Sequence, residues 1–503
     1  MPSIPVDWLP PFMFAVLLLF MVSGFPVAFA LAANGLLFGY IAIEQGLMSP
    51  ALLQALPERL FGIMGNDTLL AIPFFTFMGL VLERSKMAED LLETVGILFG
   101  RMRGGLAYAI VLVGALLAAT TGVVAASVIS MGLISLPIML KHGYDPKIAT
   151  GTIAASGTLA QIIPPSLVLI VLADQLGVSV GDMYAGAMIP SLMLVGLFVL
   201  YVFAVGQLRP NSLPALPAEQ YSLPARALLI RVMVVLVPPL ALIFLVLGTI
   251  FIGLATPTEA GAMGAVGAMV LAWVKQRLTF YMVREVLDAT TKLSCFVMFI
   301  LIGSTVFGLT FRAVDGDLWV EHLMGGLPGG DLGFLIAVQI LVFVLGFFLD
   351  FFEIAFIVIP LLVPVAESLD INLLWFGVMI AMNLQTSFLT PPFGFSLFYL
   401  KSVTPPSVKT LDIYKGAVPF VGLQLLMVVA IYLFPGIVTN TMHVGAKQAD
   451  PIQLNVDIER IQESRKSNNM EDGANPYGGN AYGEESRGPF VPQFSRQSLD
   501  EFK

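Results

Sequence analysis

The stretch SerGlyThrLeuAlaGlnIleIleProPro, residues 156–165, interrupts a hydrophobic segment, and AsnLeuGlnThrSerPheLeuThrProPro, residues 383–392, interrupts another in the same way. Proline lacks a backbone donor and disfavours helix at the preceding residue, so each stretch should break a membrane helix and leave oxygens unpaired. Irregular backbone is tolerated at membrane depth only where it is buried in protein or lines a cavity. The two stretches therefore predict a polar binding site inside the membrane.

The composition is that of a membrane protein, because 57% of the 503 residues are hydrophobic and only 12% are charged. A spanning helix needs about 20 apolar residues, and runs of this kind recur from residue 8 to residue 435, which predicts an all-α polytopic protein with roughly eleven full spans. The formal net charge of −9 is spread over loops and the end of the chain and indicates no nucleic-acid partner. The single cysteine, Cys295, excludes a disulfide framework and a thiolate metal site.

The beginning of the chain lacks the basic region of a cleavable signal, so its first hydrophobic stretch is expected to remain as a span. The lack of Lys and Arg there favours an outside N-terminus.

Two copies of one unit follow each other along the chain. The offset that aligns Pro164 with Pro391 also aligns Pro137 with Pro364, and the DxYxGA motif at positions 182–187 returns at 412–417 with almost the same offset. Paired broken helices in two copies are typical of secondary transporters, in which inverted repeats hold the site near the bilayer midplane. The predicted division is 1–206 first membrane repeat, 207–224 connector, 225–439 second membrane repeat and 440–503 disordered polar tail.

Each copy also contains a charged segment that cannot span, at residues 83–103 and 275–292. Both are predicted to lie as helices at the membrane surface. If the copies are inverted, these segments lie on opposite faces, and their similar numbers of Lys and Arg leave the positive-inside rule undecided.

A further interruption precedes each double proline at the same distance along the chain, at positions 120–123 and 350–353. The apolar arms around positions 120–123 are too short for independent spans and suit a re-entrant hairpin. Two hairpin tips are therefore expected to meet two broken helices in one compact site.

Such a site suits a sodium ion together with an anion. Unwound carbonyl and hydroxyl oxygens can replace the shell of a hard cation, and free N–H groups at half-helix starts can hold a carboxylate. The alternative is that these hydroxyls only bond to their own helices. The predicted sodium ligands are Ser156, Gly157, Thr158, Pro164, Asn383, Thr386, Thr390 and Pro391, and the predicted substrate-binding residues are Thr121, Gly122, Ser166, Asp350, Glu353, Phe393 and Gly394.

Asp350 and Glu353 stand in an apolar region, where an ionised carboxylate costs about 2.5 to 3.5 kcal/mol on insertion scales. Cation coordination or proton coupling would explain them. In the alternative, Asp350 caps a half-helix and Glu353 reaches water beyond the tip. Glu259, in ThrProThrGlu, is better explained as the third residue of a helix capped by Thr256.

Enzyme chemistry is not predicted. The three histidines are expected in loops or the tail, and the chain has no HExxH, GxSxG or Walker A motif. No cofactor is expected beyond sodium as a coupling ion. An ion channel remains an alternative, although channels usually repeat a filter around a multi-subunit axis.

At these same residues the chain resembles the large membrane subunit of tripartite ATP-independent periplasmic (TRAP) transporters. The resemblance covers nearly everything before the tail. Six motifs in order carry it: AlaIleProPhePhe at 71–75, GlyGlyLeuAla at 104–107, HisGlyTyrAsp at 142–145, SerGlyThrLeu through ProProSer at 156–166, AlaThrProThrGluAla at 255–260 and ThrProProPheGly at 390–394.

The resemblance implies a sodium-coupled, elevator-type importer of an organic acid in the bilayer of a bacterial inner membrane. Its implied partners are a small four-helix membrane subunit and a periplasmic substrate-binding protein; a stand-alone carrier is the alternative. The first tip reads Gly122, Val123, Val124 where GlySerSer is usual, and Phe351, Phe352 and Glu353 follow Asp350. These departures resemble the branch assigned to mannitol, chloroaromatic acids and 2-oxo or hydroxy acids.

Overall fold

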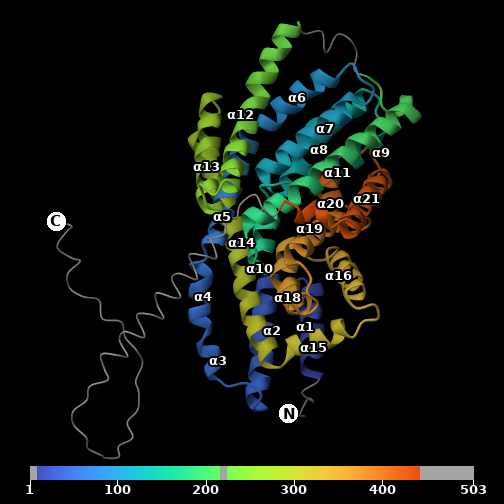
Figure 1. The fold of residues 1–503 in the computed structure, drawn as a ribbon. Coiled ribbons are helices and arrows are strands. Elements are labelled where there is room, and N and C mark those ends of the chain that lie inside the picture. The colour runs from blue at the N-terminus through green and yellow to red at the C-terminus, as the bar shows by residue number, and fades with distance from the viewer. Residues whose placement is uncertain (1–7, 216–223, 442–503) are drawn as a thin grey trace, which may run out of the picture. The chain divides into compact units, whose positions relative to one another are not determined.

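The computed structural model describes residues 8–215 and 224–441, and every regular element in these residues is a helix (Figure 1). The chain divides into a unit of Met1–Gly445 and a second unit, Ala446–Lys503. The second unit, nearly all of the predicted tail and residues 216–223 of the predicted connector lie outside the described residues. The domain boundaries given above stay predictions.

The first half of the described chain contains α1 (Leu9–Val22), α2 (Val27–Glu44), α3 (Ala51–Gln54), α4 (Leu56–Met64), α5 (Asp67–Arg84), α6 (Met87–Phe99), α7 (Gly105–Thr121), α8 (Val124–Lys141), α9 (Pro146–Thr158), η2 (Leu159–Gln161), α10 (Leu167–Leu176), α11 (Val180–Leu208) and η3 (Pro210–Ser212). The second half contains α12 (Ala225–Phe251), α13 (Pro257–Val274), α14 (Phe280–Ala313), α15 (Gly316–Gly325), α16 (Asp331–Leu345), α17 (Phe351–Glu353), η5 (Ile354–Val358), α18 (Ile359–Ser368), α19 (Leu373–Leu389), α20 (Phe395–Val403), α21 (Thr410–Leu433) and α22 (Gly436–Thr439).

The helices repeat as the sequence does. The segment from α3 to α5 covers positions 51–84, and its equivalent in the second copy, α14, covers the same length at positions 280–313. The copies interlock, because α2 packs against α14 and α5 packs against α13. The α7–α8 hairpin and the hairpin made by α16, α17, η5 and α18 approach the centre from opposite ends, as inverted copies require (Figure 1).

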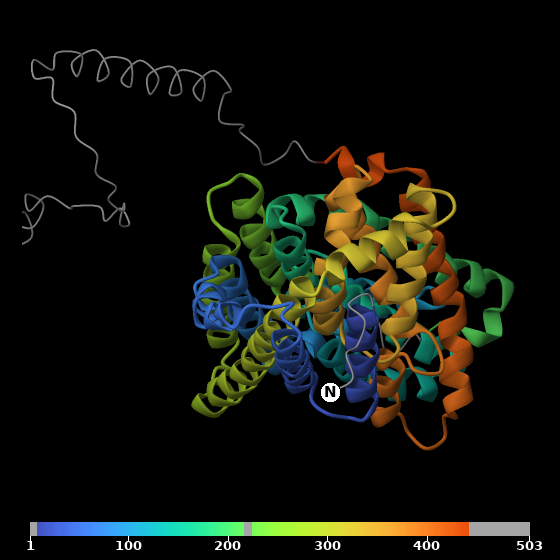
Figure 2. The same cartoon turned by 90° about the horizontal axis from the view of Figure 1, so that it is seen from below.

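The helices form two groups. We name α1 to α5 and α12 to α14 the outer frame, and α7 to α11 and α16 to α21 the inner bundle. Seen from below, α3, α4, α12 and α13 lie on one side and the orange and red helices of the bundle on the other (Figure 2). The frame meets the bundle where α5 packs on α7 and α10, and where α14 packs on α17 and η5.

The expected number of spans was too high. Seven helices of the described chain are long and apolar enough to cross a membrane, or up to eight if α3 and α4 are joined to α5 across their 49° bend. Shorter apolar helices of 10–17 residues, such as α7, α10, α16 and α19, are hairpin arms and halves of broken helices. Hydropathy counts them as spans because it measures only apolar length.

The two charged segments do not lie on opposite faces as expected. Lys275 Nζ lies 2.8 Å from Asp90 Oδ2, and Arg84 Nη1 lies 3.7 Å from Glu285 Oε2, so both segments meet at the same end. Residues 280–292 are not a separate surface helix but the first part of α14, whose 34 residues exceed the bilayer's hydrocarbon thickness. The element equivalent to α6 is α15, which follows α14 as α6 follows α5.

Helices α9 and α21 join the two repeats through glycines. A Cβ added to Gly151 would lie 2.1 Å from the carbonyl oxygen of Gly416, and one added to Gly416 would lie 2.0 Å from that of Lys147. Backbone cannot yield as a flexible side chain does. The glycine of the second DxYxGA motif is therefore needed for close helix packing.

We predict that Gly416→Ala lowers the thermal midpoint of the purified protein, because overpacking costs about 1–3 kcal/mol or more. The matched control is Gly422→Ala in the same helix, where an added Cβ meets nothing within 4 Å. Equal midpoints for the two variants would contradict this account of the crossing.

Candidate functional site

The first hairpin tip lies against the first broken helix. Thr121 ends α7, and Gly122 follows with a left-handed φ of 59°. A Cβ added to Gly122 would lie 3.1 Å from Cγ of Leu167, the first residue of α10. The structure thus brings Thr121 and Gly122 to the start of the half-helix that Ser166 precedes.

The first break is fully enclosed. After α9 ends at Thr158, the chain makes the short turn η2 and a cis Pro164–Pro165 bond before Ser166 at the start of α10. Ser156, Thr158, Gln161 and Ser166 are all 0% exposed. The predicted sodium residues of this copy therefore lie in the protein interior.

The second break has the same plan. Helix α19 ends at Leu389, Thr390 follows, and a cis Pro391–Pro392 bond leads through Phe393 to Gly394, which precedes α20. This break is less enclosed, since Phe393 is 46% exposed. The rings of Phe348 and Phe393 lie 5.5 Å apart, so the second tip reaches its own break.

At equivalent positions of the two breaks, a backbone carbonyl loses its helical donor. In each copy a serine hydroxyl donates to that carbonyl, but the two serines are not at equivalent positions. Ser166 Oγ donates to the Gln161 carbonyl at 2.8 Å, and Ser396 Oγ donates to the Phe388 carbonyl at 2.9 Å. Gln161 and Phe388 correspond by the same offset that aligns the double prolines. Because an unpaired carbonyl is costly in a buried site, the two copies keep the same hydrogen bond through non-equivalent residues.

The tyrosines of the DxYxGA motifs serve the same purpose. The Tyr184 hydroxyl donates to the Ser166 carbonyl at 3.5 Å, and the Tyr414 hydroxyl donates to the Pro392 carbonyl at 3.3 Å. The motif therefore supports the backbone just after each double proline. The sequence showed the motif only as a repeat signal.

The hydroxyl groups behave in two ways. The threonines donate to carbonyls of their own helices: Thr158 to Ala155 at 2.8 Å, Thr386 to Met382 at 3.1 Å and Thr390 to Thr386 at 2.7 Å. The alternative of local bonding thus describes their donors, although a hydroxyl that donates keeps lone pairs for a cation. Ser156 Oγ is buried and has no partner among the described residues.

Asn383 faces the second hairpin, because its Nδ2 donates to the Gln339 carbonyl of α16 at 2.6 Å. It therefore fixes α19 against the hairpin arm. Gly157 lies in the last turn of α9, where an added Cβ would meet the Val128 side chain of α8 at 2.2 Å.

The two acids of the second tip form a capping box. Asp350 Oδ1 accepts from the Phe351 N–H at 2.6 Å, and Glu353 Oε2 accepts from the Asp350 N–H at 2.9 Å. Of the alternative stated above, the capping role of Asp350 is confirmed, whereas Glu353 does not reach water, since its side chain turns back to the backbone and the residue is 7% exposed. Capping by Glu259 is confirmed, with the Thr256 N–H donating to its Oε2 at 2.8 Å.

Three buried glutamines near the breaks were not among the predicted site residues. Gln161, Gln385 and Gln424 are 0% exposed, and each carries at least one amide atom without a partner in the described part of the chain. Gln424 Nε2 of α21 donates to Thr158 Oγ1 at 3.2 Å, so the second repeat reaches the first break. Buried unpaired amides cost free energy, which points to a ligand or water in the functional state.

The glutamines at the two breaks occupy different positions in the repeat. Gln385 is the equivalent of Thr158 by the offset of the double prolines, and Leu194 is the equivalent of Gln424 by the offset of the DxYxGA motifs. One copy thus pairs Thr158 with a glutamine from α21, while the other places the glutamine on the broken helix itself. The first break thus has Gln424 beside Thr158 in addition to Gln161, and the second has Gln385 at the position equivalent to Thr158, which only the repeat alignment together with the fold reveals.

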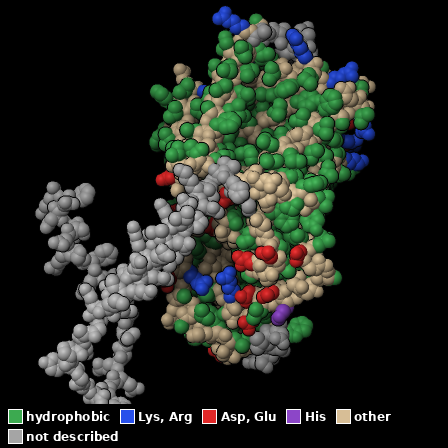
Figure 3. Space-filling view, viewed as in Figure 1, with side chains coloured by type: hydrophobic (Ala, Val, Ile, Leu, Met, Phe, Trp, Pro, Cys, Tyr) green, Lys and Arg blue, Asp and Glu red, His purple; other side chains and the backbone are tan. Residues whose placement is uncertain are grey.

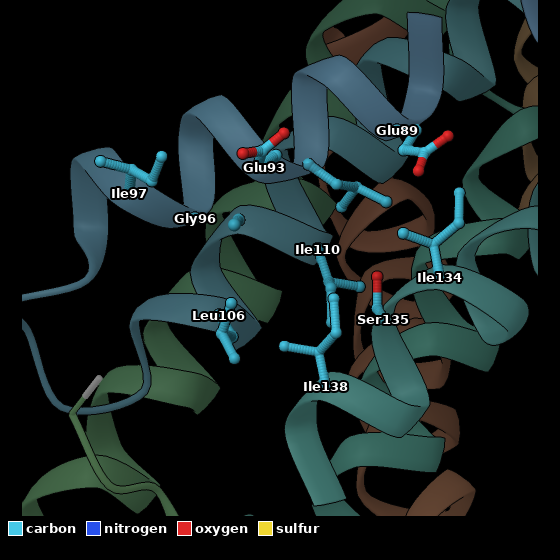
Figure 4. Close-up of a pocket in the computed structure, with 11 residues that line it drawn as sticks. Glu89, Glu93, Gly96, Ile97, Leu106, Ile110, Ile134, Ser135 and Ile138 are labelled. Atoms are coloured by element: carbon cyan, nitrogen blue, oxygen red, sulfur yellow. The ribbon is translucent and has the colours of Figure 1, made fainter. Parts of the chain in front are cut away.

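A separate pocket of about 410 Å³ lies between α6 and the arms α7 and α8 (Figure 4). Glu89 and Glu93 stand on its α6 side, and Leu106, Ile110 and Ile138 line the hairpin side. None of the predicted site residues lines it. This pocket is therefore not the candidate site.

Residues 14–437 match the family described as "Tripartite ATP-independent periplasmic transporter, DctM component". The chain belongs to this family. The large permease is 30% identical over 400 residues to the "C4-dicarboxylate TRAP transporter large permease protein DctM" of Pseudomonas aeruginosa, covering 78% of this chain and 90% of that protein. It is 28% identical over 417 residues to the "Sialic acid TRAP transporter large permease protein SiaM" of Vibrio cholerae, covering 82% and 93%. These relatives are transporter permeases and not enzymes.

The fold is shared with the Alcanivorax borkumensis YdaH transporter, whose crystal structure is described as having "an unusual topology". The TM-score is 0.57 at 15% identity, and the match covers 78% of this chain and 90% of that chain. The polytopic all-α fold with two repeats is thereby confirmed. At this identity the likeness concerns the fold alone.

We predict that Gln385→Leu leaves the thermal midpoint unchanged or raises it, because it removes a buried amide without partners among the described residues. Gln424→Leu also removes the hydrogen bond to Thr158 and should lower the midpoint slightly. Both variants should lose stabilisation by added sodium, measured as the shift in midpoint. The control is Gln339→Leu, whose amide also lacks a partner among the described residues but lies in α16 outside the breaks. Unaltered sodium shifts in the first two variants would refute a ligand role.

Proposed function

We propose that this permease is the large subunit of a sodium-coupled TRAP secondary transporter that imports an organic acid. The observation that carries the proposal is the pair of buried breaks, each with buried polar atoms that lack partners in the described chain, in a member of this family. Hydroxyl, carbonyl and amide oxygens suit a hard monovalent cation, and half-helix starts suit a carboxylate.

The substrate is proposed at the level of an organic acid. The relatives described above are named for C4-dicarboxylates and sialic acid, and one from Halomonas elongata is named for ectoine. These names do not support the mannitol, chloroaromatic or 2-oxo acid branch that the hairpin tips resemble. The tip sequences therefore remain the only argument for that branch.

The charge distribution supports one orientation of the permease in the membrane. Lys and Arg side chains gather at the end that carries the α6–α7 loop, whereas Asp and Glu prevail lower on this face (Figure 3). Basic loops face the cytoplasm by the positive-inside rule. We therefore place the base of the α7–α8 hairpin on the cytoplasmic side and the start of α1 on the opposite side.

We propose that the inner bundle moves as an elevator against the outer frame. A small four-helix membrane subunit and a periplasmic binding protein complete the transporter, and the binding protein selects the substrate. Family membership is the support for both partners.

The test is uptake into liposomes that contain the permease with its small subunit and binding protein. The probes are succinate, sialic acid and a 2-oxo acid, each measured with and without an inward sodium gradient. We expect uptake of one probe only with all three components and the gradient. Uptake by this chain alone, indifference to sodium, or a steady single-channel current would contradict the proposal.

A further inference from the structure

Polar side chains cross the boundary between frame and bundle at both ends of α5. Asn66 precedes its first residue and Glu83 stands in its last turn, about 25 Å away at 1.5 Å per residue. Asn66 bonds to Asp174 of α10, and Glu83 bonds to Ser130 of α8. The packing of frame against bundle along α5 is thus closed by a hydrogen bond at each end.

The Asn66 side chain does two things at the bend between α4 and α5. Its Oδ1 accepts from the Thr68 N–H at 2.9 Å and caps α5, while its Nδ2 donates to Asp174 Oδ1 at 2.8 Å. Asp174 stands in the last turn of α10, where a carboxylate opposes the helix dipole. The helix dipole therefore does not explain a carboxylate at position 174, whereas its hydrogen bond with the Asn66 side chain does.

The Glu83 side chain contacts Ser130 of the bundle on one side and lines a pocket of the frame on the other. Its Oε1 accepts from Ser130 Oγ at 3.1 Å, and its Oε2 is buried without a partner among the described residues. On the frame side it lines an open pocket of about 630 Å³ together with Lys86 and Arg277. If Ser130 moves away, the carboxylate still faces a pocket that is open and lined by the Lys86 and Arg277 side chains.

The other repeat has a bond of the same kind. Ser304 Oγ of α14 donates to the Phe356 carbonyl in the π-helical turn η5 of the second hairpin. Such turns leave an α-helical carbonyl without its usual partner and are frequent at functional sites. In both repeats, therefore, a long frame helix bonds the second arm of a hairpin.

These polar bonds contrast with the contacts inside the frame. A Cβ added to Gly303 would lie 2.3 Å from the Ala28 carbonyl oxygen, and one added to Gly35 would lie 2.8 Å from the Val306 backbone. Backbones this close cannot slide past each other without clashes. Hydrogen bonds at a boundary can instead be exchanged for water or other partners at small net cost.

We propose that Asn66–Asp174, Glu83–Ser130 and Ser304–Phe356 are latches that hold the bundle at the position seen here and open when it moves along α5. The inference rests on the proposed elevator function, because latches need a moving bundle. The latch residues position the bundle and do not bind substrate.

The test uses the distance between spin labels on the full-length chain in lipid nanodiscs. The native Cys295 of α14 is exposed and is the only cysteine, so Leu133→Cys on α8, 57% exposed, completes a frame-to-bundle pair. Asn66→Asp keeps the cap of α5 but sets a carboxylate against Asp174. Adding Asp174→Asn restores the hydrogen bond in the reverse direction, because the amide at position 174 then donates to the carboxylate at position 66.

We expect Asn66→Asp to shift the ratio of two distance populations by about tenfold, as losing a charge-assisted hydrogen bond should. The double variant should return the ratio to that of the wild type, which a merely destabilised helix would not do. Ser130→Ala should shift the ratio in the same direction, whereas Ser402→Ala, whose hydroxyl bonds to Tyr399 of its own helix, should not.

The outcomes separate the two ideas. A single wild-type distance that sodium and a transported acid never change would refute the elevator and the latches together. Two wild-type populations with an unchanged ratio in Asn66→Asp, or no recovery in the double variant, would refute the latches alone.

Discussion

The structure depends on one constraint, that a backbone carbonyl freed in the middle of a membrane must find a donor. Each double proline frees carbonyls just where two half-helices meet, and serine and tyrosine hydroxyls satisfy them. The donors come from the half-helix itself and from α11 or α21. The breaks therefore draw the surrounding helices into the bundle and hold the site in place.

The two copies agree in backbone and differ in side chains. Ser166 and Ser396 satisfy equivalent carbonyls from non-equivalent positions, and Gln385 replaces the pair of Thr158 and Gln424. Such exchanges show that the requirement lies in the hydrogen bond rather than in residue identity. They also make the two breaks chemically unequal, with one enclosed and the other open at Phe393.

Much of this architecture can be predicted from the sequence, because prolines, glycines and buried acids act locally. The breaks, the tip at Gly122 and the capping role of Glu259 follow from such local rules. Gln424 cannot be found that way, since its partner Thr158 lies 266 residues away. The prediction that residues 275–292 lie on the face opposite residues 83–103 is wrong for a similar reason. The ion pairs Lys275–Asp90 and Glu285–Arg84 form only because the two copies interlock, and a local sequence pattern does not show this.

The bend before α5 has a further meaning when the copies are compared. The same 34-residue segment is bent by 49° in the first copy and continuous as α14 in the second. In transporters built from inverted repeats, one bundle moves against the other around the site, so such a difference between equivalent frame segments makes the two sides of the molecule unequal. Cys295 occupies in α14 the place that Asn66 holds at the bend, so the copy that carries the lone thiol is the one in which this segment stays continuous.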